Sequence, residues 1–139
     1  MKQKVETTKA PKAMGPYSQA ITVGNLVLTS GQIHLTAEGK LLKGTIEAQT
    51  HQVMKNLGAV LDAAGVSFKE VVKATIYVTD MAIYGKINEV YGSYFSEPFP
   101  ARETVQAAAL PLGAEVEISL VAVKKDCCSE DNQGGCCCS

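Results

Sequence analysis

An amphipathic helix followed directly by a β-branched strand is the feature that most restricts the fold of this chain. From Thr45 to Ala64 the apolar residues recur at helical spacing, and Gly65 provides a stop signal. The next apolar run, EVVKATIYVT at 70–79, predicts a strand. A helix with one apolar stripe must cover that stripe, and a sheet built around the following strand offers the surface. The sequence therefore predicts a helix layer on a sheet.

The remaining segments extend this pattern on both sides. Gly24-Asn25 is a two-residue hairpin turn, and Asp80 is a good N-cap for a second helix with one apolar face. Further strands are predicted at 18–23, 26–31, 101–109 and 115–123. The order is β-β-α-β-α-β-β, an α+β sandwich in which two helices cover one face of one sheet. The other face is left without cover, so we expect the chain to form an oligomer.

Length and charge limit the classes of function. The 139 residues suffice for one domain, which we place at 1–125, followed by a tail at 126–139 that holds all five cysteines. We expect the tail to be a flexible appendage, with metal, thiol or lipid attachment as the alternative. A net charge of −1 with scattered lysines makes nucleic acid an unlikely partner. Without a membrane-spanning run or a secretory signal, a cytoplasmic location is expected.

Arg102 is the one arginine among thirteen basic residues. Strand alternation places Arg102 and Thr104 on one face of their strand, and Glu117 begins the last strand. Arg102 and Glu117 could therefore meet at the rim of one cleft. A guanidinium there can hold a carboxylate or phosphate with two parallel hydrogen bonds. A structural ion pair or a solvated strand end is the alternative interpretation.

Other polar residues are weaker candidates. Tyr17 could lie over a pocket, and at Ser30-Gly31 the missing Cβ could let backbone amides approach a ligand; a core tyrosine and a simple bend are the alternatives. His34 lies in a loop and could approach a site, whereas His51 is expected on a solvated helix face. The chain shows no acid–base histidine pair, phosphate loop, dinucleotide fingerprint or metal-ligand cluster outside the tail. We therefore expect no cofactor and no metal.

Several longer motifs occur together in one order. They are GPYSQAI at 15–21, TSGQI at 29–33, EAQTHQVMKNL at 47–57, FPAR at 99–102 and ALPLGAEVEISLVAV at 109–123. With them the chain, from about Lys9 to Lys124, resembles the Rid family of reactive intermediate deaminases, also called the YjgF or L-PSP family. Because it has both the FPAR arginine and the VEI glutamate, it is most similar to the reactive intermediate deaminase A branch.

The resemblance implies a fold, an assembly and a reaction. Members have a chorismate-mutase-like fold with a mixed sheet, and they form homotrimers in which three sheets line a central barrel. Their ligand clefts lie between neighbouring subunits. They hydrolyse the 2-imino acids 2-iminobutanoate and 2-iminopropanoate to 2-keto acids and ammonia, without a cofactor. Dehydratases that depend on pyridoxal phosphate release these imino acids, so a functional link to such enzymes is implied.

The resemblance also assigns roles to residues. Arg102 would hold the substrate carboxylate and Glu117 would orient or activate water. Residues lining the cleft would be Tyr17, Ser30, Gly31, Asn88 and Thr104. The physical chemistry agrees, because two hydrogen bonds fix the carboxylate plane and so present the neighbouring C=N carbon to water.

This chain departs from the family pattern at three places. His34 stands where many members have proline, and Thr104 stands where some have cysteine, which removes thiol chemistry. Ser119 replaces a second acidic residue that members often have after the VEI glutamate. Two other functions remain open at this point. One is an endoribonuclease or translation inhibitor, which the near-neutral charge disfavours. The other is a sensor of small carboxylates, or a chaperone-like protein, that uses the same fold without turnover.

Overall fold

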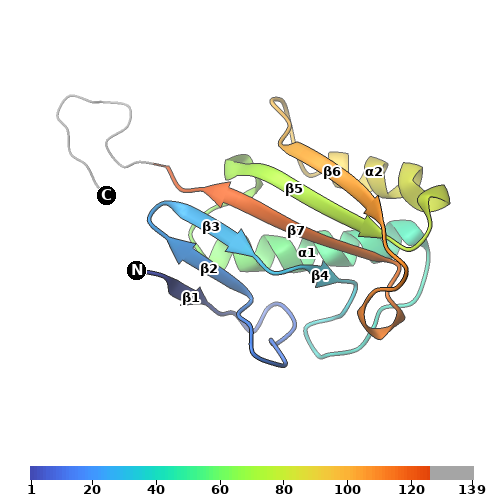
Figure 1. Cartoon of the computed structure of the whole chain (residues 1–139), viewed down its shortest axis with the longest axis horizontal. Helices are drawn as coiled ribbons and strands as arrows, with labels where there is room; N and C mark the ends of the chain where they lie inside the picture. The colour runs from blue at the N-terminus through green and yellow to red at the C-terminus, as the bar shows by residue number, and fades with distance from the viewer. Residues whose placement is uncertain (126–139) are drawn as a thin grey trace.

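A computed structural model, which describes residues 1–125, has one mixed sheet with two helices behind it (Figure 1). The strands are β1 (Gln3–Val5), β2 (Ala20–Val23), β3 (Leu26–Thr29), β4 (Gln32–Ile33), β5 (Val71–Val78), β6 (Ala101–Gln106) and β7 (Val116–Val123). The helices are α1 (Ile46–Ala63) and α2 (Tyr84–Gly92), with single 3-10 turns η1 (Phe68–Glu70), η2 (Met81–Ile83) and η3 (Pro111–Gly113). The α+β class predicted from the sequence is confirmed.

The sheet order is β1-β2-β3-β7-β5-β6, and the short β4 pairs with β7 beside β3. Every pairing is antiparallel except β5 with β6, which are parallel because α2 carries the chain from one to the other. β7, the last strand in sequence, therefore lies in the middle of the sheet. β6 is an edge strand, and its outer row of backbone groups has no partner strand within the described residues.

Local signals explain why α1 forms where the sequence predicted it. The Thr45 hydroxyl accepts a hydrogen bond from the Ala48 amide at 3.1 Å and so caps the first turn. Gly65, at φ +86°, adopts the left-handed conformation that ends a helix. Val53, Leu57 and Val60 have no exposed surface, because the apolar stripe of α1 packs on the sheet.

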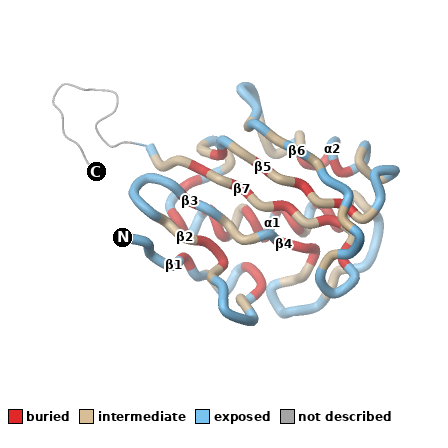
Figure 2. Tube along the Cα trace, in the orientation of Figure 1, coloured by how far each residue is buried: buried red, intermediate tan, exposed pale blue. Residues whose placement is uncertain are grey.

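The two faces of the sheet differ sharply in burial. In β5 and β7 alternate residues face the helices and are buried, with Ala74 and Ile118 at 0% exposure. The opposite face, which is turned toward the viewer in Figure 2, is partly or fully exposed along these strands. On it Leu26 and Leu28 of β3 and Val105 of β6 are between 39% and 45% exposed. We call this surface the open face; it has apolar side chains that none of the described residues covers.

Several elements differ from the sequence prediction. The strands predicted at 18–23 and 26–31 are shorter, Ala20–Val23 and Leu26–Thr29, and β4 was not predicted. β1 was not predicted, because three residues of mixed polarity give no periodic signal. The predicted strand 101–109 ends at Gln106, where the chain turns toward η3. Asp80 caps η2 by accepting from the Ala82 amide at 2.9 Å, so α2 begins at Tyr84 and not directly after Asp80.

Within residues 1–125, no helix is long and apolar enough to cross a membrane. The predicted cysteine-rich tail at 126–139 lies outside the described residues.

Candidate active site

Arg102 is held in a fixed orientation by neutral groups of α2. Its Nη1 donates to Asn88 Oδ1 at 2.6 Å, and its Nη2 donates to the Tyr84 hydroxyl. The guanidinium carbon lies 5.5 Å from the ring centre of Tyr84 and 5.2 Å from that of Tyr91, within range of cation–π attraction. Of the five N–H donors of an arginine, two are used here, and the other three have no partner among residues 1–125 and can bind a ligand.

No carboxylate of residues 1–125 lies within ion-pair distance of Arg102; the two ion pairs of this part of the chain are Lys4–Glu6 and Lys73–Glu103. The structural ion pair proposed as an alternative for Arg102 is therefore absent from residues 1–125. A partly buried cation with oriented donors and no counter-ion is a site for an anion.

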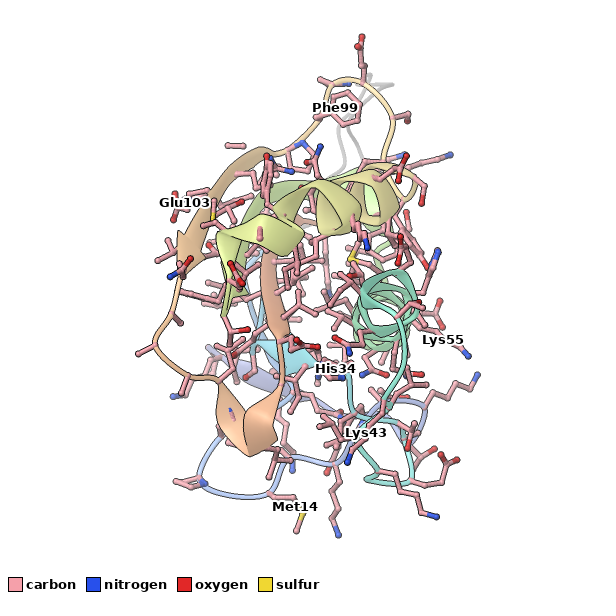
Figure 3. The ribbon with its side chains drawn as sticks, turned by 90° about the vertical axis from the view of Figure 1, so that its right-hand side faces the viewer. Met14, His34, Lys43, Lys55, Phe99 and Glu103 are labelled. Carbon is pink, nitrogen blue, oxygen red and sulfur yellow. The ribbon has the colours of Figure 1, made fainter. Side chains whose placement is uncertain are left out.

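A pocket of about 420 Å³ opens beside Arg102. Its walls are Asn88, Tyr91, Gly92, Phe99 and Pro100. Figure 3 shows Phe99 on the loop that leads into β6, at the end of the molecule where α2 and β6 lie close together. Burial raises the pKa of Tyr91, although the charge of Arg102 partly opposes this rise. The phenol is therefore neutral, and the pocket combines aromatic walls with a single positive group.

Tyr84 and Tyr91 were not among the residues predicted for the site. Both tyrosines share one face of α2 with Asn88, because residues four and seven positions apart lie on the same side of a helix. This spacing around Asn88 is a signal that could have been found in the sequence.

Glu117 lies on the open face, directly over Gly31. A Cβ added to Gly31 would come within 2.0 Å of Glu117 Oε2, so only glycine leaves room for this carboxylate. No lysine or arginine of the described residues forms an ion pair with Glu117. Burial raises the pKa of the Glu117 carboxyl. A carboxylate with a raised pKa is suited to act as a general base near neutral pH.

Ser30, the neighbour of Gly31 in sequence, is bonded to the segment that carries Tyr17. The Ser30 hydroxyl donates to the Ser18 carbonyl at 2.6 Å, and the Ser30 amide donates to the Gln19 carbonyl at 2.9 Å. These bonds hold the segment that carries Tyr17 against the strand end. The Tyr17 ring is 54% exposed and borders another pocket, of about 740 Å³, beside the N-terminal segment. The predicted alternative of a core tyrosine is wrong.

Thr104 follows Arg102 on the same face of β6. Its Oγ1 is buried and has no hydrogen-bond partner. A buried hydroxyl without a partner is uncommon in native proteins and is often completed by a ligand or water. We therefore group Thr104 with Arg102, which lies on the same face of β6, and with Asn88, which is bonded to Arg102.

Arg102 and Glu117 do not meet within one chain, which corrects the expectation of a shared rim. Arg102 is paired with Ala74 of β5 and Glu117 with Tyr77. Residues 74 and 77 are an odd number of positions apart, so they point to opposite faces of the sheet. Figure 3 agrees, because Glu103, the neighbour of Arg102, points away from the helices. Arg102 therefore faces the helix layer, and Glu117 faces the open face.

The predicted residues thus form two groups. The Arg102 group comprises Asn88, Arg102 and Thr104, with Tyr84 and Tyr91 added by the structure. The Glu117 group comprises Tyr17, Ser30, Gly31 and Glu117. The Arg102 group contains a positive charge and no carboxylate, whereas the Glu117 group contains a carboxylate and no positive charge.

The two histidines lie apart and differ in setting. His51 is exposed, as predicted, and its Nδ1 lies 2.8 Å from the Tyr94 hydroxyl. His34 lies in a loop, as predicted, but it is 2% exposed, with both ring nitrogens bonded to main-chain groups. The two rings therefore do not face one common site. Within residues 1–125 no three His, Cys, Asp or Glu side chains are close enough together to hold a metal ion.

Comparison with known proteins gives consistent matches. The family model described as Endoribonuclease L-PSP matches residues 7–124. Reactive Intermediate Deaminase A, chloroplastic, of Arabidopsis thaliana is 50% identical over 122 residues, which cover 87% of this chain and 65% of the Arabidopsis protein. The 2-iminobutanoate/2-iminopropanoate deaminase of Mus musculus is 46% identical and covers 86% of this chain and 90% of the mouse protein. The crystal structure of a Thermotoga maritima protein, 52% identical, matches with a TM-score of 0.88 over 90% of this chain and 99% of its own.

Proposed function

Because the chain belongs to the endoribonuclease L-PSP family, whose members include reactive intermediate deaminases, we propose that it hydrolyses 2-imino acids to 2-keto acids and ammonia. The substrates proposed are 2-iminobutanoate and 2-iminopropanoate, which the name of the mouse relative contains. Enzymes that depend on pyridoxal phosphate and dehydrate serine or threonine would supply them. A cytoplasmic location is part of the same proposal.

The observation that carries the proposal is the state of Arg102. Its guanidinium is oriented by Asn88 and Tyr84, lies near two aromatic rings and has no counter-ion among the described residues. A small planar carboxylate is the ligand that such a fork binds with two hydrogen bonds. The pocket of about 420 Å³ beside it suits a molecule of a few carbon atoms and not a nucleic acid strand.

The separation of the two groups supports a site shared between copies of the chain. Arg102 and Glu117 face opposite sides of one sheet, so one ligand can touch both only if they come from different copies. The open face has apolar side chains that no described residue covers, and the edge strand β6 carries Arg102 and Thr104. We propose a homotrimer in which the open faces line a central barrel and the Glu117 group of one copy meets the Arg102 group of its neighbour.

In such a cleft the chemistry needs only water and one base. Arg102 holds the substrate carboxylate and thereby fixes the plane of the adjacent C=N carbon. The oxygen of a water molecule bonds to that carbon while Glu117 takes one water proton, and the C=N electron pair moves to nitrogen. Protonated Glu117 then gives its proton to the nitrogen. Glu117 then takes the proton of the hydroxyl group and passes it to the same nitrogen, so that the C–N bond breaks, ammonia leaves and the C=O bond of the ketone forms.

An assay that couples a threonine dehydratase to ammonia release tests the activity. The dehydratase generates 2-iminobutanoate, which also decays slowly in water, so the measured quantity is the acceleration caused by this protein. We expect acceleration by wild type and only the uncatalysed rate with Arg102→Ala. Equal rates with wild type and without protein would refute the proposed activity.

Endoribonuclease activity, the other function implied by the family model's description, has less support. Cleavage of RNA by acid–base catalysis would favour two histidines facing one site. His34 is buried in the loop after β4, however, and His51 is exposed on α1. Phosphate contacts also need clustered basic side chains, and Arg102 is the one cation in its pocket.

A further inference from the structure

His34 is a buried side chain that the proposed reaction does not use. It follows β4 and lies between that strand and α1 (Figure 3). Its Nδ1 lies 2.8 Å from the Leu42 carbonyl oxygen, and its Nε2 lies 3.1 Å from the Glu115 amide nitrogen. Its own carbonyl accepts from the Leu42 amide at 2.8 Å. His34 therefore ties the loop that follows β4 to the residue that precedes β7.

The partners determine which ring nitrogen carries the proton. A carbonyl oxygen only accepts and an amide N–H only donates, so Nδ1 must be the donor and Nε2 the acceptor. The ring is thus a neutral imidazole with one tautomer. Glu115 is held a second time, because Gln49 of α1 donates to its Oε1 at 3.0 Å and to the Gly44 carbonyl at 3.1 Å.

These contacts lie next to the place where Glu117 covers Gly31. Glu115 is two residues before Glu117, and Ile33, the residue before His34, pairs with Glu117 in the sheet. β4 contains only two residues, so its ladder alone gives weak control of how the segment from Gly31 sits against β7. The hydrogen bond from the Glu115 amide to His34 Nε2 connects the segment after β4 to the segment before β7, next to the Ile33–Glu117 pair.

We propose that His34 is a positioning residue for the deamination step, because its Nε2 holds the start of β7 so that the Glu117 carboxylate stays over Gly31. This inference rests on the proposed function, in which Glu117 is the base. His34 touches neither the substrate nor the water, and it acts through Glu115 alone.

Two substitutions separate the two nitrogens of the ring. In His34→Gln the longer side chain carries its amide near the place of Nε2, so it can still accept from Glu115. In His34→Asn the shorter side chain reaches only the place of Nδ1, so it keeps the bond to Leu42 and loses the one to Glu115. His51→Asn, the same change at the exposed histidine, is the matched control.

We expect His34→Asn to lower kcat roughly 10- to 100-fold, since a shift of about 1 Å in a catalytic group can cost a hundredfold. His34→Gln should retain kcat within about threefold of wild type, and His51→Asn should not change it. The Kd for 2-oxobutanoate should stay the same in all three, because Arg102 is not disturbed. Equal losses of kcat in the Gln and Asn variants would assign His34 to loop stability only and overturn the inference.

A readout without turnover distinguishes this inference from the proposed function. Burial raises the pKa of Glu117, so displacement into water should lower it, and an NMR titration of its carboxyl carbon measures this. A lower pKa in His34→Asn but not in His34→Gln supports positioning even if wild type shows no deaminase activity. An active enzyme in which His34→Asn alters neither this pKa nor kcat contradicts it.

A measurement on the wild type needs no variant to fold. The nitrogen chemical shifts of the His34 ring report which nitrogen carries the proton. We expect the Nδ1–H tautomer; a proton on Nε2 would mean that the bond to Glu115 does not form, and the inference would fail.

Discussion

Gly31→Ala tests whether Glu117 acts from the place that the structure gives it. The added Cβ would lie 2.0 Å from Glu117 Oε2, 2.9 Å from Cδ and 3.0 Å from Cγ. Ordinary contact begins at 3.4 Å, so the carboxylate oxygen must move by about 1.4 Å or more. The Glu117 side chain is flexible and partly exposed, so we expect it to rotate away while the backbone stays in place.

The expected cost falls on turnover and not on folding. A misplacement of about 1 Å can cost a hundredfold in rate, so kcat should fall roughly 100-fold. The backbone of Gly31 does not have a left-handed φ, so alanine fits it without strain. A Gly→Ala change at such a place stabilises by about 0.4–1 kcal/mol through the unfolded chain, which offsets part of the crowding. The melting temperature should therefore change little.

The assay compares kcat for Gly31→Ala, Glu117→Gln and the double variant. If Gly31 acts by leaving room for Glu117, the double variant should be no slower than Glu117→Gln alone. Gly85→Ala on α2, where an added Cβ meets nothing within 4 Å, is the control. Losses that add in the double variant would refute the reasoning, because Gly31 would then act independently of the carboxylate.

Three further predictions concern the charged groups. Arg102→Ala removes charge-assisted hydrogen bonds worth roughly 1.5–3 kcal/mol, so calorimetry should show at least about tenfold weaker binding of 2-oxobutanoate. The affinity of Arg102→Lys should be nearer to that of Arg102→Ala than to that of wild type, and equal affinity in all three proteins would make Arg102 a structural residue. Tyr84→Phe keeps the ring over Arg102 but removes the hydroxyl acceptor, so the same titration should show affinity lower by about 3- to 10-fold, and no change would remove Tyr84 from the site. Burial raises the pKa of Glu117 above its ordinary value of 4.5, so the folded protein favours the protonated carboxyl group. The contribution of this proton to folding stability is fully present below the ordinary pKa and is lost as the pH rises through the raised pKa. Glu117→Gln should therefore melt higher than wild type at neutral pH and equally in acid, and a difference that does not vary with pH would contradict this.

Local signals were enough to predict α1 and the strands of the sheet's centre. Thr45 and Gly65 cap a strongly periodic segment, and β5 follows it as a β-branched run within one residue of the predicted bounds. The prediction that Thr104 and Arg102 share one face of their strand is also confirmed. The motifs identified the family, which the comparisons confirm.

Long-range pairing explains what the sequence could not show. Alternation fixes which residues of one strand share a face, but the choice of face depends on register against another strand. The opposite facing of Arg102 and Glu117 follows from the pairs with Ala74 and Tyr77, which no local pattern contains. The role of His34 depends in the same way on the amide of Glu115, 81 residues later in the chain.

Mixing two inactive variants tests the shared site most directly. Arg102→Ala retains Glu117, and Glu117→Gln retains Arg102, so a cleft between one copy of each can contain both wild-type groups. If the variants are co-expressed in equal amounts and assort at random in a closed ring, about a quarter of the clefts should be intact. We predict that the mixture recovers about a quarter of wild-type deaminase activity, while each variant alone stays near the uncatalysed rate. A mixed oligomer with no more activity than either variant would contradict the account, because the two groups would then have to act within one chain.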